Sequence, residues 1–352
     1  MHPMNTRSAR GPTQAPSGYR RRWGILALLL AALACLAGLA VAERKTSPSG
    51  QVAPRSQATS PTGTVTPGAG TAAPRQGQLA AVSWPADGVS TADISGFGVV
   101  AGPGATRPVP IASVAKVMTA YVVLHDYPLP GGGSGPGIVV QPSEAAAYPS
   151  QVRDGDSLVP VVAGEMLTER QALEALLLPS ADNVAWILAR WDAGSQAAFV
   201  ARMNATARRL GMTGTSYTDS SGLDPSTTST AADQVRLGMA AMRMPALAAI
   251  AAMPTAVVPV AGVVRNYNTL LGQDGIIGLK TGSTQAAGGC VLVAAWHKAS
   301  GRKTLIVAAA FGQPGTAQTI LPNALQASHN LVLALDRALG QGPRRKDLSA
   351  HG

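Results

Sequence analysis

Ser113 and Lys116 have the residue types and the spacing that serine-based acyl transfer requires. They stand three positions apart in the run 110–120, and side chains three apart on a helix lie on one face. A serine hydroxyl is a weak nucleophile until a base accepts its proton, and a lysine amine serves as that base when burial or a nearby cation lowers its pKa. Apolar residues surround Lys116, which favours a buried lysine with a chemical role. A capping serine beside a solvated lysine is the alternative.

A second lysine begins the tetrapeptide Lys280-Thr281-Gly282-Ser283, which precedes a predicted β-hairpin. On an edge strand, a lysine and a hydroxyl can bind a substrate carboxylate, and a glycine lets the backbone come close to it. An exposed strand lysine is the alternative interpretation of this tetrapeptide.

A third polar group stands in the loop 179–183, between two predicted helices. Ser180, Asp182 and Asn183 could face a substrate from this loop. Ser180 or Asp182 could instead cap the following helix.

The elements that must position these residues follow from hydrophobic periodicity and turn signals. Short strands are expected at 79–84 and 96–101 and longer ones at 289–296 and 304–311, with a turn at 299–302. Helices are expected at 113–126, 168–178, 183–191, 197–210 and 323–339. Strands at both ends with helices between them predict an α+β domain, with an antiparallel sheet flanked by helices and a separate helical lobe.

The order and spacing of the three motifs resemble those of the penicillin-binding D-alanyl-D-alanine carboxypeptidases, with their Ser-x-x-Lys, Ser-x-Asn and Lys-Thr-Gly motifs. Ser180 follows Ser113 by 67 positions, and Lys280 follows Ser180 by 100. Connecting segments such as 164–168, 199–204 and 221–223 also match. The resemblance covers about 79–311 and implies the β-lactamase/transpeptidase-like fold.

The resemblance also implies a role for each motif residue. Ser113 would attack the D-Ala-D-Ala carbonyl of a peptidoglycan stem peptide, Lys116 would accept its proton, and Ser180 would help to protonate the leaving D-alanine. Water would then hydrolyse the acyl-enzyme, so that no metal or cofactor is needed. Penicillin and other β-lactams would acylate Ser113 as inhibitors.

The remaining motif residues would bind the substrate. Lys280 and Thr281 would hold the terminal carboxylate beside Gly282, and the backbone N–H groups of Ser113 and Ser283 would form the oxyanion hole.

One position departs from the family pattern, because Asp182 stands where the motif has Asn and the amide is displaced to Asn183. An ionised Asp accepts hydrogen bonds but cannot donate them, and it would add negative charge near an anionic substrate. A catalytically weakened peptidoglycan- or penicillin-binding module is therefore the alternative to a D-Ala-D-Ala carboxypeptidase. Rapid penicillin hydrolysis of the class A β-lactamase type is not expected, since no glutamate follows Glu174.

Charge and composition argue against other functions. The net charge is +10, but nine basic residues precede Gln76, three follow Gly342, and the sixteen between are matched by sixteen acidic ones. This distribution predicts no nucleic-acid binding. Two cysteines and five scattered histidines give no disulfide framework and no metal-ligand spacing.

The N-terminal sequence predicts export. A basic cytoplasmic segment is expected at 1–22, followed by an uncharged run at 23–42 that is long enough for a transmembrane anchor, with a cleaved signal peptide as the alternative. Residues 43–78 are rich in Pro, Ser, Thr and Gly and are expected to be a linker. The catalytic domain is expected at 79–340, outside the cell membrane or in the cell wall, and a basic disordered tail at 341–352.

Overall fold

The computed structural model describes residues 79, 82–299 and 301–340, all of which belong to one compact unit. The predicted segments 1–22, 23–42, 43–78 and 341–352 lie outside the described residues. Among the helices of the described part, none has both the length and the apolar character needed to cross a membrane.

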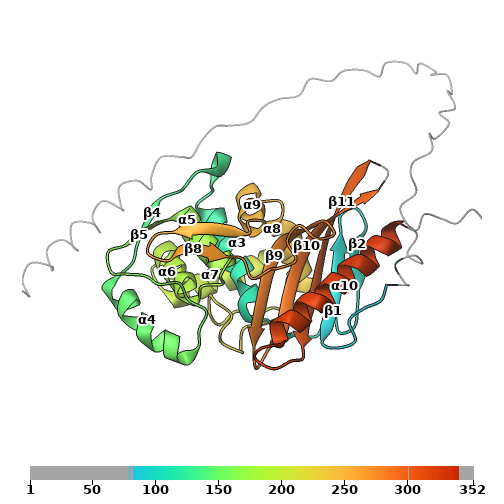
Figure 1. Cartoon of the computed structure of the whole chain (residues 1–352), viewed down its shortest axis with the longest axis horizontal. Coiled ribbons are helices and arrows are strands. Elements are labelled where there is room, and N and C mark those ends of the chain that lie inside the picture. The colour runs from blue at the N-terminus through green and yellow to red at the C-terminus, as the bar shows by residue number, and fades with distance from the viewer. Residues whose placement is uncertain (1–78, 80–81, 300, 341–352) are drawn as a thin grey trace, which may run out of the picture. The chain divides into compact units, whose positions relative to one another are not determined.

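The described residues form a central antiparallel sheet of five strands in the order β2-β1-β11-β10-β9 (Figure 1). Their bounds are β1 Val89–Ile94, β2 Gly98–Ala101, β9 Ile276–Thr284, β10 Gly288–Ala299 and β11 Arg302–Gln313. The sheet thus joins the two ends of the domain, as predicted. It also makes β9, which carries the Lys280 tetrapeptide, an edge strand.

The prediction of a strand at 79–84 is wrong. Residues 82–85 have no regular secondary structure, and the hairpin that the sequence indicated is formed by β1 and β2. The Trp84 ring packs against Gly102, where an added Cβ atom would lie 2.5 Å from Cε3. Pro85 follows at once and has no N–H to donate to a ladder. Val82 and Trp84 therefore pack on the sheet without joining it.

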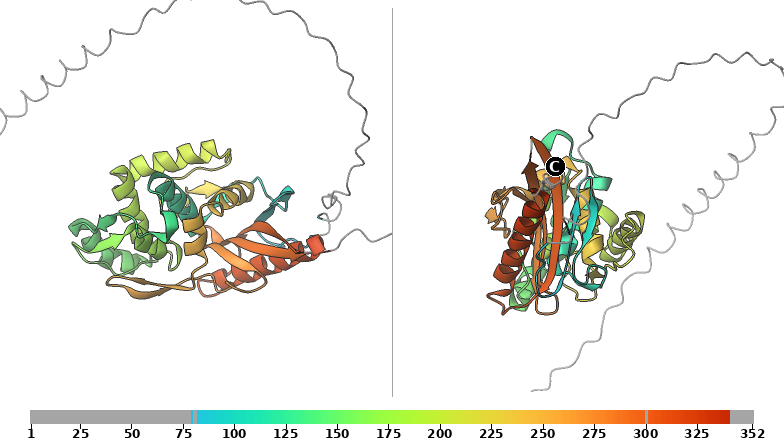
Figure 2. Two further views of the ribbon diagram at one scale, coloured as in Figure 1. Left: turned by 90° about the horizontal axis from the view of Figure 1, so that it is seen from above. Right: turned by 90° about the vertical axis from the view of Figure 1, so that its right-hand side faces the viewer.

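Both faces of the sheet are buried. Successive strand residues point to opposite faces, so that Leu292 and Ala294 belong to the larger core, whereas Val291 and Val293 belong to a smaller one. Helix α10 (Ile320–Gly340) closes the smaller core, and the remaining helices lie on the other face (Figure 2).

The helical lobe surrounds α3 (Lys116–Asp126), which packs against the helices α5 to α9. The bounds of the other helices are α4 Pro142–Asp154, α5 Glu169–Leu177, α6 Asp182–Ala193, α7 Gln196–Arg209, α8 Ala231–Ala241 and α9 Pro245–Ala251. The predicted helices α3, α5, α6, α7 and α10 are confirmed, whereas α4, α8 and α9 were not predicted. Thr168 caps α5 through a capping box with Gln171.

Short elements complete the described part. Two turns of 3-10 helix are η1 (Ala112–Ala115) and η2 (Pro130–Gly132). Three two-stranded ladders pair β3 (Val109–Pro110) with β6 (Thr228–Ser229), β4 (Gly137–Val139) with β5 (Met166–Thr168), and β7 (Thr255–Val258) with β8 (Gly262–Arg265). Of these, η1 matters most for the site, because it leads directly into α3.

Candidate active site

Ser113 lies in η1, immediately before α3. It is partly exposed, while its neighbours Ala112, Val114 and Ala115 are buried. Ala112 has a φ of +47°, an unusual conformation for a residue with a side chain. Gly222 packs so closely on the Ala112 carbonyl that a Cβ atom would overlap with it. This packing fixes the turn that presents Ser113.

Lys116 is completely buried, with 0% of its surface exposed. Its Nζ donates to Ser113 Oγ at 2.8 Å, to Asp182 Oδ1 at 2.7 Å and to the Ser221 carbonyl at 3.0 Å. An ammonium group has three donors, and all three have acceptors. These contacts offset the large cost of burying a charged amine.

Asp182 opens α6 and is held on both carboxylate oxygens. Oδ1 accepts from Lys116, and Oδ2 accepts from the Ser157 backbone N–H at 2.9 Å. Asp182 thus brings a negative charge into the site, as expected, and its carboxylate forms an ion pair with Lys116.

Asn183 is also buried, but it does not stand in for the motif Asn. Its amide donates to the Val159 carbonyl at 2.8 Å and accepts from the Val159 N–H at 3.3 Å. These contacts engage both ends of the amide with the Val159 backbone, and a substrate-binding role for Asn183 stays a prediction.

Ser180 carries a buried hydroxyl that is available to hydrogen-bond a ligand. It is 3% exposed and its φ is +65°, and within the described part of the chain its Oγ has no hydrogen-bond partner. Leaving a buried hydroxyl unpaired costs about 1–3 kcal/mol. Such a group in a strained backbone is typical of a functional site.

Lys280 lies on β9 with 1% of its surface exposed, and its Nζ donates to the Thr281 carbonyl at 2.8 Å. Burial, followed by the positive charge of Lys116, holds the pKa of Lys280 well below its usual range, while Asp182 opposes the shift. The motif residues of α3, α6 and β9 thus share one electrostatic environment. Thr281 is buried and Ser283 is exposed.

Gly282 allows β9 to approach the nucleophile turn. A Cβ atom at this position would lie 2.8 Å from the Ser113 backbone nitrogen and 3.0 Å from that of Val114. Only glycine leaves room for this approach. It brings the backbone of Ser113 next to the strand that carries Ser283, as an oxyanion hole formed by these two residues requires.

The loop whose Ser221 carbonyl accepts the third Lys116 hydrogen bond had no predicted role. Asp219 Oδ2 accepts from Ser221 Oγ at 2.6 Å and from the Gly222 N–H at 2.8 Å, and Thr119 Oγ1 donates to the Ser220 carbonyl at 2.6 Å. Asp219 therefore orders the loop whose carbonyl holds Lys116. The match of residues 221–223 to the family was the feature of the sequence that could have pointed to this loop.

Comparisons with known proteins agree with this geometry. Residues 92–312 match the family model described as D-alanyl-D-alanine carboxypeptidase. The D-alanyl-D-alanine carboxypeptidase DacB2 of Mycobacterium tuberculosis is 36% identical over 235 residues, which are 65% of this chain and 75% of the relative. A D-alanyl-D-alanine endopeptidase of Pseudomonas aeruginosa is 34% identical over 212 residues, 58% of this chain and 65% of the relative.

Solved structures show the same fold. The crystal structure of a D-alanyl-D-alanine carboxypeptidase from Mycobacterium tuberculosis H37Rv has a TM-score of 0.60 and 32% identity, and the match covers 75% of this chain and 96% of that one. The Streptomyces K15 DD-transpeptidase matches with a TM-score of 0.61 at 24% identity over 72% of this chain and 98% of its own. This chain therefore belongs to the D-alanyl-D-alanine carboxypeptidase family of serine peptidases.

Proposed function

We propose that this chain removes the terminal D-alanine from peptidoglycan stem peptides through an acyl-Ser113 intermediate. The observation that carries the proposal is the 2.8 Å contact between Lys116 Nζ and Ser113 Oγ, made by a lysine that is fully buried. A nucleophile and a base within hydrogen-bond distance, with the base oriented by a third group, are the signature of covalent catalysis.

The surroundings of Lys116 suggest how it takes the proton. A neutral amine has two N–H groups, which can donate to Asp182 and to the Ser221 carbonyl, both of which already accept from Nζ. The amine lone pair then faces Ser113 and accepts its proton as Oγ attacks the peptide carbonyl. The backbone N–H groups of Ser113 and Ser283 stabilise the oxyanion.

The other motif residues serve the leaving group and the carboxylate. The unpartnered hydroxyl of Ser180 is suited to pass a proton from Lys116 to the amine of the departing D-alanine. Lys280 and Thr281 bind the terminal carboxylate of the substrate. Burial disfavours the protonated form of Lys280, and the negative charge of the bound carboxylate favours it again. Water then attacks the ester carbonyl while Lys116 accepts a proton from it, and Lys116 passes that proton to Ser113 Oγ as the ester bond breaks, which regenerates the free enzyme.

The same chemistry gives a long-lived adduct with penicillin. The β-lactam ring opens on Ser113, and no glutamate after Glu174 is available to activate a hydrolytic water in the class A β-lactamase manner. Asp182 accepts from Lys116 and from the Ser157 N–H, and a carboxylate that orients the base in this way supports a catalytic site over a weakened binding module.

Membrane attachment is also a proposal. The uncharged run at 23–42 after the arginines at 20–22 supports export with the catalytic domain outside the cell membrane, or secretion into the cell wall if the run is cleaved. A protease-protection assay on intact cells tests it, because an exported domain is digested from outside.

The decisive experiment is mass spectrometry of the purified chain after incubation with penicillin, together with an assay of D-alanine release from a stem pentapeptide. We expect a single stable adduct and D-alanine release, both absent in the Ser113→Ala variant. An adduct without release would support a binding module instead. Release that persists in Ser113→Ala would remove Ser113 from its role.

A further inference from the structure

The segment 155–159 follows α4 and passes beside the buried Lys116–Asp182 pair. Helix α4 ends at Gly155, whose φ of +81° lets the Asp156 N–H donate back to the last turn of the helix at 3.2 Å. The chain then meets the start of α6, where the next residue pairs with Asp182 through its backbone. Its N–H donates to Asp182 Oδ2 at 2.9 Å, and its carbonyl accepts from the Asp182 N–H at 2.6 Å.

This segment is fixed in position before any substrate binds. Besides the two bonds between Ser157 and Asp182, the N–H and the carbonyl of Val159 bond to the side-chain amide of Asn183. The segment 155–159 is thus tied to α6 at two successive points. A recognition element that is already ordered loses little conformational entropy on binding.

Asp156 supplies a carboxylate to this segment. The residue is half-buried, and within the described residues its carboxylate has neither a hydrogen bond nor an ion pair. Lys116 cannot pair with it, because all three of its N–H groups already have acceptors. Burial raises the pKa of the Asp156 carboxyl, and the negative charges of Asp182 and Asp154 add to this shift against the opposing charge of Lys116. Asp156 thus carries a charge at the site without a paired cation in the described part of the chain.

The two sides of Ser113 differ in the charged groups that they carry. Lys280 lies on β9 of the central sheet, whereas Asp156 follows α4 in the helical lobe, and α3 lies between these elements (Figure 1). Lys116 and Asp182 balance each other within the site. What remains is a lysine on the side of the sheet and a carboxylate on the side of the lobe. A ligand with a carboxylate at one end and an ammonium group farther back is complementary to this arrangement.

We propose that Asp156 selects substrates with a free amine on the residue that precedes D-Ala-D-Ala. This specificity rests on the proposed function, in which Lys280 and Thr281 hold the terminal carboxylate and Ser113 attacks the carbonyl of the preceding residue. The remainder of the peptide then continues beyond Ser113, away from Lys280, toward the lobe that carries Asp156. An ammonium group on its next residue pairs with the carboxylate, whereas an acylated amine is uncharged and does not.

The test is steady-state D-alanine release by the full chain from two pentapeptides that have lysine as the third residue. In one the lysine amine is free, and in the other it is acetylated. We expect a KM about fivefold lower for the free amine at similar kcat, as for a partly exposed ion pair. Asp156→Asn should abolish this difference, and Asp156→Lys should reverse it. Benzylpenicillin carries no amine, so that labelling of Ser113 reports whether each variant retains an intact site.

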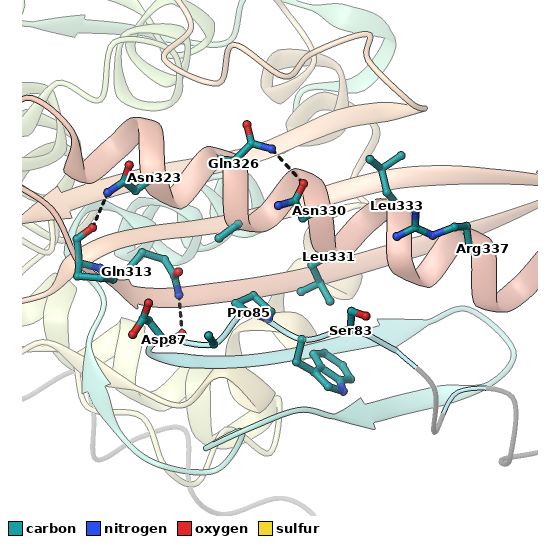
Figure 3. A pocket seen from close by; sticks show the side chains of 14 residues that line it. Ser83, Pro85, Asp87, Gln313, Asn323, Gln326, Asn330, Leu331, Leu333 and Arg337 are labelled. Carbon is teal, nitrogen blue, oxygen red and sulfur yellow. Dashed lines mark hydrogen bonds between the residues drawn. The ribbon is translucent and has the colours of Figure 1, made fainter.

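Asp87→Asn is the matched control, because it removes the same charge from an exposed position. Asp87 lies in the segment 83–87 beside α10 (Figure 3), and α10 covers the face of the sheet opposite to α3. This variant should keep the fivefold preference of the parent chain. A preference that is lost in Asp87→Asn as well would overturn the assignment, because the net charge of the protein, and not a contact with Asp156, would then set it.

Two further results would overturn the assignment of Asp156 alone. These are equal KM values for the two peptides in the parent chain, and a preference that Asp156→Asn leaves unchanged, each in protein that penicillin labels and that releases D-alanine. The absence of release from both peptides would refute the proposed function and, with it, the specificity. The release assay therefore separates the two failures.

Discussion

Asp182 and Lys116 form a buried ion pair, with 2.7 Å between Oδ1 and Nζ and with 4% and 0% of the side chains exposed. The two residues are 66 positions apart in the chain and belong to different helices. Lys116 Nζ also donates to Ser113 Oγ, so that the three side chains form a Ser-Lys-Asp array. In the mechanism proposed above, the carboxylate of Asp182 orients the base.

Replacement of Asp182 by Asn should lower activity. Both carboxylate oxygens accept hydrogen bonds, and an amide offers one oxygen, so that either Lys116 or the Ser157 N–H would face an NH₂ group. A lost hydrogen bond to a charged group costs about 1.5–3 kcal/mol, which predicts a roughly tenfold to hundredfold fall in kcat/KM. Steady-state kinetics of D-alanine release measures it, with Asp87→Asn as the exposed control. A gain in kcat/KM would revive the weakened-site hypothesis.

Replacement of Gly282 by Ala should slow acylation. The new Cβ atom would lie 2.8 Å from the Ser113 nitrogen, which forces β9 and η1 apart and disturbs the oxyanion hole. Overpacking of this kind costs about 1–3 kcal/mol of stability, and the loss of one oxyanion donor slows the reaction about a hundredfold or more. Stopped-flow penicillin acylation and urea denaturation report the two effects. Gly340→Ala, with nothing within 4 Å, is the control, and equal acylation rates in both variants would contradict the prediction.

Replacement of Lys280 by Met should stabilise the protein while impairing substrate binding. In the folded chain the pKa of Lys280 lies below its usual value of 10.5. At any pH between the folded and the unfolded pKa, the unfolded chain therefore binds a proton that the folded chain lacks. The free energy of unfolding contributed by Lys280 therefore rises with pH across this window and is lowest below the folded pKa. Urea denaturation from pH 6 to pH 10 should show a stability gain in the variant that shrinks as pH rises.

The same Lys280→Met variant should have a higher KM for the pentapeptide, because the substrate carboxylate loses its cation. A variant that is less stable than the parent at the lower pH values, or one whose KM is unchanged, would refute the assignment of Lys280.

Replacement of Glu169 by Gln should remove a pH-dependent loss of stability. Burial, reinforced by the nearby Asp192, raises the pKa of Glu169 from 4.5 to about 7, against the opposing charge of Arg170. Neither carboxylate oxygen has a hydrogen-bond partner among the described residues. Because the folded pKa is the higher one, stability falls as pH rises from 4.5 to about 7, and the penalty is complete above that pH.

At pH 8, therefore, Glu169→Gln should be more stable than the parent by about 1–3 kcal/mol, and the two should converge near pH 4. Thermal or urea denaturation at both pH values measures the difference. A constant difference between the two proteins at all pH values would show that Glu169 does not titrate as described.

The sequence by itself determined the chemistry of the site. Ser113 and Lys116 are neighbours through the three-residue spacing of one helical face, and the Lys280 tetrapeptide lies beside strands whose apolar runs mark a buried sheet. These are local relations, so periodicity and turn signals reveal them. The same local reasoning placed a strand at 79–84, where Trp84 packs against Gly102 instead.

Only the tertiary structure decided which groups meet. The partners of Lys116 at Asp182 and Ser221 lie 66 and 105 positions away, and the approach of Gly282 to Ser113 joins an edge strand to a helix start. Asp182 and Asn183 were both expected at the site, but adjacent residues at the start of a helix point in different directions. Packing directs Asp182 toward Lys116 and Asn183 toward the Val159 backbone.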